Sequence, residues 1–436
     1  MKKARSSQST YLIIGNSIAG VKAIEGIREV DSSARVIVVS NEHVKNYSRP
    51  LISYYVGMKV SADRMPFKEF SFYSEQNIDL RLGTTVTQVD TLHKKALLAP
   101  GGWVSFDKLL IATGGKPFVP PITGLRDIEQ GVFTFTTLED SQRLINYVET
   151  NTIKHAVILG AGLIGLKCAE GLVARGLKVT LVELADRVLA NTFDLEASRI
   201  IERALAGWGC EVIKQNTINQ LQQHSSALTG VIPATGQAIA TKLLVVAIGV
   251  SPNIDLVAST DIAVNRGILV DNHMETNIPG IFAAGDVAQA KDLLSHQTSV
   301  IAIWPVAAQQ GYTAGLNMAG SPTEYSGSFP MNSIELAGIP TISFGVTNPA
   351  DTQTFEILAR KDPNDAWYRK IVLKDNRVVG AIFLGRIERA GIFSGLIKNQ
   401  VDVASFKGDF LSDDFGLLIL PAQYRKHLVQ GEGIEV

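Results

Sequence analysis

The chain has 436 residues, of which 46% are hydrophobic and 19% are charged, and its formal net charge is −1. This length predicts two or three domains, and the small net charge without a basic block argues against a nucleic-acid or anionic-membrane partner. Only two cysteines occur, Cys168 and Cys210, which excludes a disulfide framework, a redox cysteine pair and a cysteine-ligated iron–sulfur cluster within this chain.

The N-terminal segment 1–10 is polar and basic and lacks the apolar stretch of a signal peptide. No run of about 18 or more apolar residues is present to span a membrane, so the cytoplasm is the expected location. The seven histidines show no metal-ligand spacing, and we expect no metal site.

The first structural signal is a glycine-rich turn that follows the apolar strand Tyr11–Ile14. The turn reads Gly15-Asn16-Ser17-Ile18-Ala19-Gly20. In a dinucleotide-binding turn the first glycine permits the strand-to-helix bend, the second admits a pyrophosphate, and the third lets the helix pack on the strand. Ser17 stands at the second glycine position, where a small residue still lets a pyrophosphate approach. The strand Arg35–Ser40 leads to Glu42, which we expect to bind the ribose hydroxyls.

The first βαβ region closes with a buried strand that ends in small residues, Leu109 to Gly115, and the proline-rich stretch Pro117–Pro121 is a predicted linker. A second glycine turn, Gly160-Ala161-Gly162-Leu163-Ile164-Gly165, then follows the strand Ala156–Leu159. Taken singly, either turn can also occur in an α/β domain that binds no nucleotide.

The acidic residue of the second turn is Glu183, at the end of the strand Val179–Val182. A carboxylate here binds a free ribose 2′-hydroxyl and repels a 2′-phosphate. Leu184 and Ala185 follow it, where an NADP site often has an arginine. The sequence therefore predicts NAD(H) in preference to NADP(H).

A third signal is the stretch from Ile278 to Asp286, which contains Ala283, Ala284 and Gly285. Its small residues let a ligand approach the backbone, and the Asp286 carboxylate suits a polyol chain that supplies hydroxyl donors. The alternative for Asp286 is an ordinary helix cap.

After Tyr325 the pattern changes to hairpins and short helices. The segments Ile371–Lys374 and Arg377–Phe383 flank Asp375-Asn376, which predicts a tight turn, and Ala390–Asn399 has a helical pattern. This third region has no nucleotide turn and is a predicted interface domain.

Together these motifs resemble the FAD-dependent pyridine nucleotide-disulfide oxidoreductase superfamily. The resemblance implies an α/β fold with two Rossmann-like dinucleotide-binding domains, the FAD domain being interrupted by the NAD domain, and a C-terminal α+β interface domain. The implied boundaries are 1–118 and 251–325 for the two parts of the FAD domain, 119–250 for the NAD domain and 326–436 for the interface domain.

The resemblance also implies the residues that contact each cofactor. The implied FAD ligands are Gly15, Ser17, Gly20, Glu42, Arg49, Val86 (through its backbone), Thr113, Gly114, Gly285, Asp286, Trp304 and Gln309. The implied NAD ligands are Gly160, Gly162, Ile164, Gly165, Glu183 and Gly249.

Within the superfamily, the run from Tyr47 to Ser53 resembles the "Y-S-R-P-x-L-S" stretch of rubredoxin reductases and nitrite-reductase flavoproteins. This region has no redox cysteine, which disfavours thiol, peroxide and disulfide chemistry. Two positions depart from the family pattern: Tyr54 replaces a lysine, and Lys167 replaces a glutamate. Our hypothesis is that Lys167 supports negative charge on the reduced flavin or orients the nicotinamide, and the alternative is a solvated helix lysine.

The C-terminal region is similar to that of flavoprotein subunits of larger redox complexes. The implied function is electron transfer between NAD(H) and a redox partner through FAD, in a phenylglyoxylate-type 2-oxoacid dehydrogenase complex whose iron–sulfur clusters lie in other subunits. Two alternatives remain open: a stand-alone NADH-dependent rubredoxin- or ferredoxin-type reductase, and a non-catalytic FAD/NAD-binding regulatory subunit.

Overall fold

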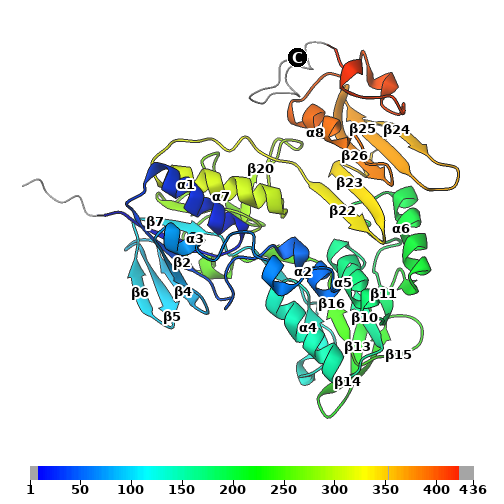
Figure 1. The fold of residues 1–436 in the computed structure, drawn as a ribbon, viewed down its shortest axis with the longest axis horizontal. Helices are drawn as coiled ribbons and strands as arrows, with labels where there is room; N and C mark the ends of the chain where they lie inside the picture. Colours follow the sequence, from blue (N-terminus) through cyan, green and yellow to red (C-terminus); the bar gives the residue numbers. More distant parts are fainter. Residues whose placement is uncertain (1–7, 352, 422–436) are drawn as a thin grey trace, which may run out of the picture. The chain divides into compact units, whose positions relative to one another are not determined.

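The computed structural model describes residues 8–351 and 353–421, which form two compact units (Figure 1). The first unit contains residues 8–119, 134–150 and 249–328, and the second contains 120–133, 151–248 and 329–421. Residues 134–150 therefore group with the segments expected to form the FAD domain, although the sequence places them within the range expected for the NAD domain. The C-terminal region groups with the segments expected to form the NAD domain.

The first unit is built on a parallel sheet with the strand order β19-β7-β1-β2-β3. Leu12, Ile13, Ile37 and Leu110 in this sheet are completely buried, because parallel strands are covered on both faces. The strands are β1 (Thr10–Ile14), β2 (Arg35–Val39), β3 (Ile78–Arg81), β7 (Lys108–Ile111) and β19 (Ile281–Ala283).

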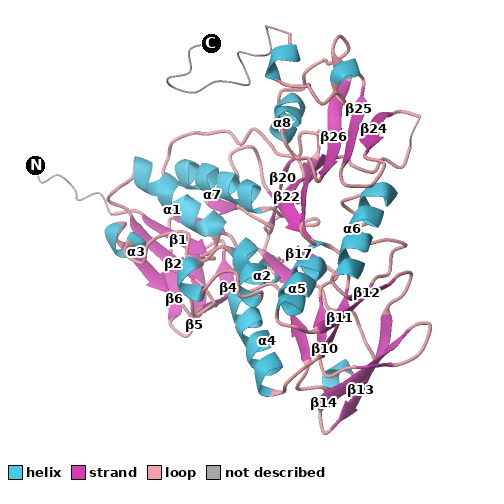
Figure 2. Ribbon diagram, turned by 45° about the vertical axis from the view of Figure 1, so that its right-hand side comes forward, coloured by secondary structure: helices cyan, strands magenta, loops and turns pink. Residues whose placement is uncertain are grey.

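Helices α1 (Ile18–Val30) and α7 (Trp304–Met318) of this unit lie side by side, as Figures 1 and 2 both show. Their backbones touch: a Cβ on Gly311 would lie 2.1 Å from the carbonyl oxygen of Ala19, and one on Gly315 would lie 2.3 Å from that of Ala23. The contacts advance in the same direction along both helices, so both N-termini lie at the same end of the pair.

Shorter elements complete the first unit. Its other helices are α2 (Ile52–Val56), α3 (Phe72–Glu75) and α4 (Leu138–Thr150), with 3-10 turns at Arg49–Leu51, Ala62–Arg64 and Asp255–Val257. A second sheet contains β4 (Thr85–Asp90), β5 (Lys95–Ala99) and β6 (Gly102–Ser105), and a third contains β18 (Ile268–Leu269), β20 (Ala288–Lys291) and β21 (Thr298–Ser299). Strands β8 (Gly115–Pro117) and β17 (Val250–Pro252) pair antiparallel.

The second unit repeats the same design around the sheet β12-β11-β10-β16-β9, in which β10 to β12 and β16 run parallel. The strands are β9 (Val132–Thr134), β10 (His155–Leu159), β11 (Lys178–Val182), β12 (Cys210–Ile213) and β16 (Leu244–Val246), with helices α5 (Leu163–Ala174) and α6 (Leu195–Gly207) and a 3-10 turn at Leu125–Asp127. A further sheet contains β13 (Ile218–His224), β14 (Ala227–Pro233) and β15 (Ile239–Ala240), all three labelled in Figure 1. The two parallel sheets confirm the expected pair of Rossmann-like domains.

The C-terminal part of the second unit is an antiparallel sheet of order β22-β23-β26-β25-β24 with helix α8 (Ala390–Lys398). The strands are β22 (Met331–Leu336), β23 (Ile339–Gly345), β24 (Glu356–Lys361), β25 (Tyr368–Lys374) and β26 (Arg377–Leu384), and 3-10 turns follow at Lys407–Asp409 and Leu417–Ile419. Asp375 and Asn376 form the turn between β25 and β26, with φ of +50° and +53°. Both residue types tolerate this left-handed conformation, as the sequence pattern indicates.

Candidate dinucleotide-binding sites

The bend between β1 and α1 requires glycine at two positions. Gly15 has φ +116°, and a Cβ there would lie 2.1 Å from the carbonyl oxygen of Ala112. A Cβ on Gly20 would lie 2.0 Å from the carbonyl oxygen of Gly15. With glycine at both positions, the chain can turn sharply from β1 into α1. The free N–H groups at the N-terminus of α1 then favour the binding of an anion.

The start of α1 has an uncapped N-cap position and, beside it, one buried donor without a partner among the described residues. Ser17 is the N-cap residue of α1, and its side chain makes no capping hydrogen bond. The buried Asn16 accepts a hydrogen bond from the Tyr73 hydroxyl at 2.7 Å through Oδ1, whereas its Nδ2 has no partner among the described residues. An uncapped helix start beside an unsatisfied donor fits a ligand with acceptor oxygens, such as a pyrophosphate.

The Glu42 carboxylate is held from both sides. The Tyr47 hydroxyl donates to Oε2 of Glu42 at 2.7 Å, and Arg49 forms an ion pair with Oε1. Arg49 also donates to the carbonyl oxygen of Thr136 at 2.8 Å and approaches the Ser17 hydroxyl at 3.4 Å. The predicted ribose ligand and the predicted FAD contact Arg49 are therefore one hydrogen-bonded group next to the glycine turn.

The Asp286 carboxyl lies in the same unit, after β19. Burial raises the pKa of Asp286, and the positive charge of Arg49 opposes that shift only in part. No hydrogen bond to this carboxyl is seen within residues 8–351 and 353–421. A partly buried acceptor of this kind fits the hydroxyl donors of a ribityl chain.

Gln310 lies in the run compared with the flavin-side helix start, but it is not among the predicted FAD ligands. Its side chain is 1% exposed and its Oε1 accepts a hydrogen bond from the backbone N–H of Gly285 at 2.9 Å. Gln310 therefore links α7 to the residue that precedes Asp286. The neighbouring Gln309, which the sequence predicts instead, is exposed and accepts a long 3.5 Å hydrogen bond from Ser328.

The remaining predicted FAD ligands also lie in the first unit. The Thr113 hydroxyl donates to the carbonyl oxygen of Asn253 at 2.8 Å, and Gly114 has φ +67°. Val86, in β4, packs against the main core of the unit. Trp304 begins α7, and its ring lies edge-on to Phe67 at 5.3 Å.

The second glycine turn has the geometry of the first. A Cβ on Gly165 would lie 2.0 Å from the carbonyl oxygen of Gly160, which has φ +104°. Gly162 is the N-cap residue of α5 and Ile164 lies in the first turn of that helix; a Cβ on Gly162 would meet no atom within 4 Å. This open space before an uncapped helix start fits a dinucleotide phosphate.

Glu183 lies against this second turn. Its Oε2 accepts a hydrogen bond from Ala161 N at 2.6 Å, and its Oε1 accepts one from Ala185 N at 2.8 Å. Each carboxylate oxygen has a further lone pair for a ribose hydroxyl. Gly249, with φ +122°, belongs to the first unit, where its carbonyl oxygen accepts a hydrogen bond from Phe118 N at 3.0 Å.

Lys167 is buried in α5 and is not a solvated helix lysine. Its ammonium contacts the carboxylate of Glu170 and the carbonyl oxygen of Glu335 at 3.2 Å. Glu170 in turn accepts a hydrogen bond from Ala337 N at 2.6 Å. These contacts connect α5 to the hairpin between β22 and β23, and a role of Lys167 at the cofactors stays a hypothesis. Tyr54 lies in α2, with the Lys59 ammonium 5.6 Å from its ring centre.

The two cysteines are both buried. Burial raises the pKa of the Cys168 thiol and raises that of Cys210 to about 11. In the described part of the chain no cluster of three or more His, Cys, Asp or Glu side chains is placed to hold a metal ion, and none of the helices there could cross a bilayer.

A family model for the pyridine nucleotide-disulphide oxidoreductases matches residues 9–311, and one for the C-terminal domain of rubredoxin NAD+ reductase matches residues 330–401. The chain belongs to the pyridine nucleotide-disulphide oxidoreductase family. This oxidoreductase is 30% identical over 406 residues to the epsilon subunit of NADH-dependent phenylglyoxylate dehydrogenase of Aromatoleum evansii, covering 92% of this chain and 94% of that one. The confirmed family makes it a FAD- and NAD(H)-dependent flavoprotein oxidoreductase.

Two further matches differ in what they cover. A nitrite reductase [NAD(P)H] of Bacillus subtilis is 28% identical and matches 90% of this chain, which spans only 48% of that relative's length. The water-forming NADH oxidase of Lactobacillus brevis, solved with NADH bound, superposes with a TM-score of 0.83 over 94% of both chains at 24% identity. The likeness to the NADH oxidase structure shows that this chain has the same fold.

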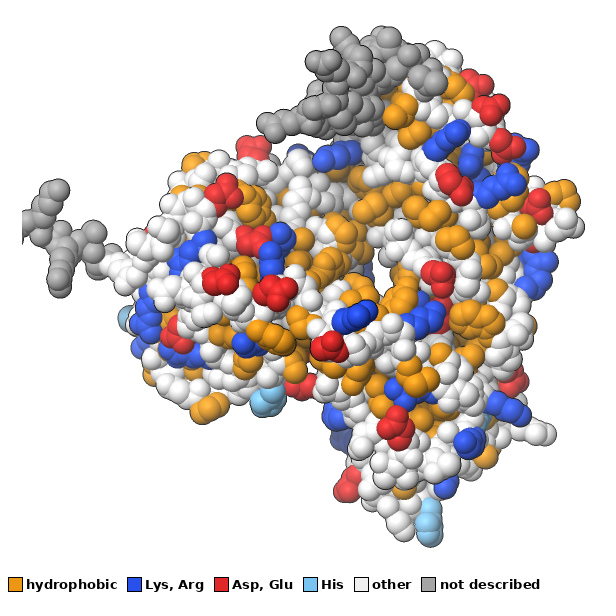
Figure 3. Space-filling view, viewed as in Figure 1, with side chains coloured by type: hydrophobic (Ala, Val, Ile, Leu, Met, Phe, Trp, Pro, Cys, Tyr) orange, Lys and Arg blue, Asp and Glu red, His pale blue; other side chains and the backbone are white. Residues whose placement is uncertain are grey.

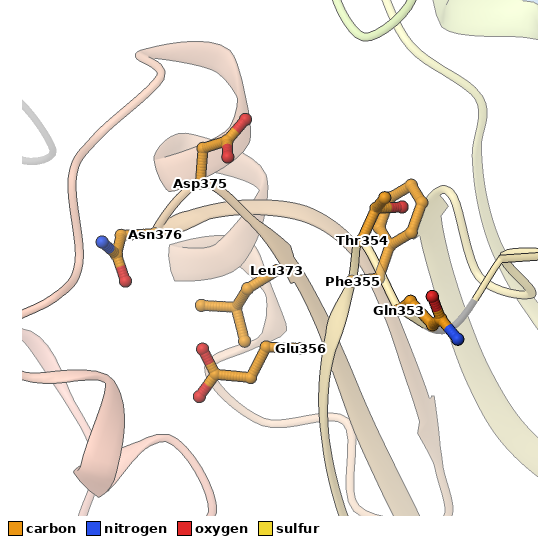
Figure 4. Close-up of a pocket in the computed structure, with 7 residues that line it drawn as sticks. All are labelled: Gln353, Thr354, Phe355, Glu356, Leu373, Asp375 and Asn376. Atoms are coloured by element: carbon orange, nitrogen blue, oxygen red, sulfur yellow. The ribbon is translucent and has the colours of Figure 1, made fainter.

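A surface pocket lies in the C-terminal sheet of the oxidoreductase. It has a volume of about 320 Å³ and is lined by Gln353, Thr354, Phe355, Glu356, Leu373, Asp375 and Asn376. Figure 4 shows Asp375 and Asn376 at the turn after β25, and Phe355 on the segment that enters β24. Lys407 pairs with Glu356 at 2.5 Å and donates to Asn376 at 3.1 Å, so this polar rim is already hydrogen-bonded.

The surface charge of the oxidoreductase is mixed. On the face drawn in Figure 3, acidic and basic side chains lie near one another on each unit. This pattern agrees with the net charge of −1.

Proposed function

We propose that this oxidoreductase passes electrons between NAD(H) and an iron–sulfur partner through FAD, as the NAD-reducing subunit of a phenylglyoxylate-type 2-oxoacid dehydrogenase complex. The support is the relative from Aromatoleum evansii, a named subunit of such an enzyme, which matches over nearly its whole length. We also propose that the protein works in the cytoplasm.

The observation that carries the proposal is the combination of two glycine turns, each with its own carboxylate, and the lack of an accessible thiol. Glu42 and Glu183 each lie at one turn. Both cysteines of the sequence are buried with raised pKa values, so neither is suited to relay electrons as a thiolate. We therefore expect electrons to leave for an acceptor outside this chain.

The residues of the chain bind and orient the cofactors in this proposal. The N-termini of α1 and α5 hold phosphates, Glu42 and Glu183 bind ribose hydroxyls, and Asp286 binds the ribityl chain. When bound, FAD exchanges electron pairs with NAD(H) and single electrons with a metal centre. The buried Gln310 keeps the backbone of Gly285 in place beside Asp286.

The preference for NAD(H) over NADP(H) follows from Glu183. Its carboxylate is fixed by the two backbone N–H groups of Ala161 and Ala185. A fixed negative charge repels a 2′-phosphate, and it cannot turn away without leaving both donors unpaired.

A stand-alone NADH-dependent reductase of rubredoxin, ferredoxin or a similar carrier is the second candidate. It is favoured by the match of residues 330–401 to the C-terminal domain of rubredoxin NAD+ reductase. A non-catalytic FAD/NAD-binding regulatory subunit is the third, and it predicts that NADH does not reduce the bound flavin.

Anaerobic purification from the native host, with an affinity tag on the chromosomal gene, tests the proposal. We expect thiamine diphosphate- and cluster-bearing subunits to co-purify in fixed ratio, identified by mass spectrometry and by iron and thiamine assays. A lone flavoprotein that reduces a small iron–sulfur protein with NADH would support the second candidate instead. Loss of the visible flavin absorbance when NADH is added anaerobically would exclude the third.

A further inference from the structure

The hydroxyl of Tyr47 joins two parts of the first unit that are 91 residues apart in the sequence. It donates a hydrogen bond to Oε2 of Glu42 at 2.7 Å and accepts one from the backbone N–H of Leu138 at 3.1 Å. Leu138 is the first residue of α4. The side chain of Tyr47 is 6% exposed, so water competes little with either bond.

Arg49 makes a second connection between the same two places. One guanidinium nitrogen pairs with Oε1 of Glu42, and another donates to the carbonyl oxygen of Thr136 at 2.8 Å. Each Glu42 oxygen is therefore held by a side chain that also holds the start of α4. Residues 134–150 group with the FAD-binding unit, and these bonds are a physical reason for it.

The arrangement preorganises the Glu42 carboxylate. A carboxylate whose two oxygens are both fixed has little freedom left to lose when a ligand hydroxyl binds its remaining lone pairs. Burial raises the pKa of Tyr47, so its hydroxyl stays protonated and remains a donor at neutral pH.

We infer that Tyr47 is a positioning residue for FAD, which fixes the Glu42 carboxylate for the ribose and couples FAD binding to the docking of α4. The inference rests on FAD binding at the first glycine turn and is independent of the electron partner. A purely structural tyrosine would change the stability of the protein and leave the FAD affinity unchanged.

The variant Tyr47→Phe keeps the ring and removes only the hydroxyl. We expect the dissociation constant of FAD, measured by fluorescence titration of the apoprotein, to rise about tenfold, as for the loss of one hydrogen bond to a charged acceptor. In the wild-type protein, FAD should slow amide hydrogen exchange at residues 136–140, and this protection should be lost in the variant.

Tyr55→Phe is the matched control. Tyr55 lies in α2, and the described residues show no hydrogen bond to its hydroxyl, so both readouts should equal those of the wild type. Unchanged FAD affinity and retained exchange protection in Tyr47→Phe would overturn the inference.

Glu42→Gln is a second variant in case Tyr47→Phe does not fold. It keeps the shape of the side chain, weakens the bonds from both Tyr47 and Arg49, and should also lose FAD-dependent protection at residues 136–140. Retained protection would contradict the coupling. Neither readout involves an electron acceptor, so a wrong partner assignment would leave both results as they are.

Discussion

The Asp286 carboxyl is held where its negative charge is disfavoured. Burial raises its pKa, and the nearby Arg49 only partly offsets the effect. An acidic group whose pKa is raised on folding adds stability below its unfolded pKa, about 3.9, and this contribution is lost as pH rises through the folded value. At neutral pH the charged Asp286 therefore destabilises the apoprotein. We propose that a carboxylate occurs at this position because it binds FAD.

Replacing Asp286 by asparagine tests this trade between stability and binding. We expect the Asp286→Asn apoprotein to melt at a higher temperature than the wild type at pH 7, with the difference vanishing near pH 3.5, close to the ordinary aspartate pKa of about 3.9. FAD should bind about tenfold more weakly, because the neutral amide is a poorer acceptor for hydroxyls. Asp255→Asn, at an exposed carboxylate paired with Lys116, is the control and should alter neither property much. A less stable Asp286→Asn apoprotein at pH 7 would contradict the argument.

At the same scale, we propose that Glu183 sets the preference for NAD(H) over NADP(H). In Glu183→Ala we expect the dissociation constant of NADH to rise about tenfold and the preference for NADH over NADPH to shrink, because both the ribose acceptor and the repulsion of a 2′-phosphate are removed. Fluorescence titration with each nucleotide measures the two constants. Glu211→Ala, at the edge strand β12, is a matched control. An unchanged ratio of the two constants would show that Glu183 does not set the specificity.

At the scale of elements, the packing of α1 against α7 positions the residues of the proposed FAD site. The glycines of α7 let the two backbones touch, and α7 then presents Gln310 to the backbone of Gly285. The glycines of α7 are visible in the sequence, but the helix against which they pack cannot be predicted from it. The contact joins residues about 290 positions apart, and local sequence patterns carry no information over that separation.

The variant Gly311→Ala tests this packing. Its Cβ would lie 2.1 Å from the carbonyl oxygen of Ala19, so α7 must shift, and we expect a loss of about 1–3 kcal/mol in the free energy of unfolding together with weaker FAD binding. The control Gly207→Ala, in α6, places its Cβ where no atom lies within 4 Å. It should stabilise the protein by up to about 1 kcal/mol through helix propensity. Equal stabilities in urea denaturation would rule out the close packing.

At the scale of the whole molecule, one buried ion pair and several hydrogen bonds connect the C-terminal sheet to the remainder of the second unit. Asp194, the N-cap residue of α6, accepts hydrogen bonds from the Tyr368 hydroxyl at 2.8 Å and the Lys370 ammonium at 2.9 Å. Lys167 and Glu170 make the corresponding contact from α5. The interface domain and the NAD-binding part are thus one compact unit.

Breaking this anchor should loosen the C-terminal region. In Asp194→Asn the ammonium of Lys370, whose side chain is 7% exposed, loses its counter-charge, and we expect a loss of about 3–5 kcal/mol in unfolding free energy. Limited proteolysis should then cut between residues 329 and 368 before the rest of the chain. Lys361→Ala, which removes an exposed pair with Glu196, should leave the unfolding free energy nearly unchanged, because solvent screens that pair. Similar proteolysis of both variants would contradict the anchoring role.

The sequence alone was enough to predict the features that depend on local backbone geometry. A strand-to-helix bend admits only glycine at Gly15 and Gly160, and Asp375-Asn376 suits a tight hairpin turn, so these elements were predictable from residue type and order. The helix predicted at Ala390–Asn399 likewise occurs as α8, because its apolar spacing is a local signal.

Only the tertiary structure decided which distant side chains meet. Tyr47 and Arg49 form hydrogen bonds with the backbone at the start of α4. Gly285 donates to Gln310, and Lys167 donates to the hairpin between β22 and β23. All these hydrogen bonds join residues far apart in the chain. Which side chains meet depends on how the sheets and helices pack in three dimensions. The pattern of polar and apolar residues along the sequence carries no information about that packing.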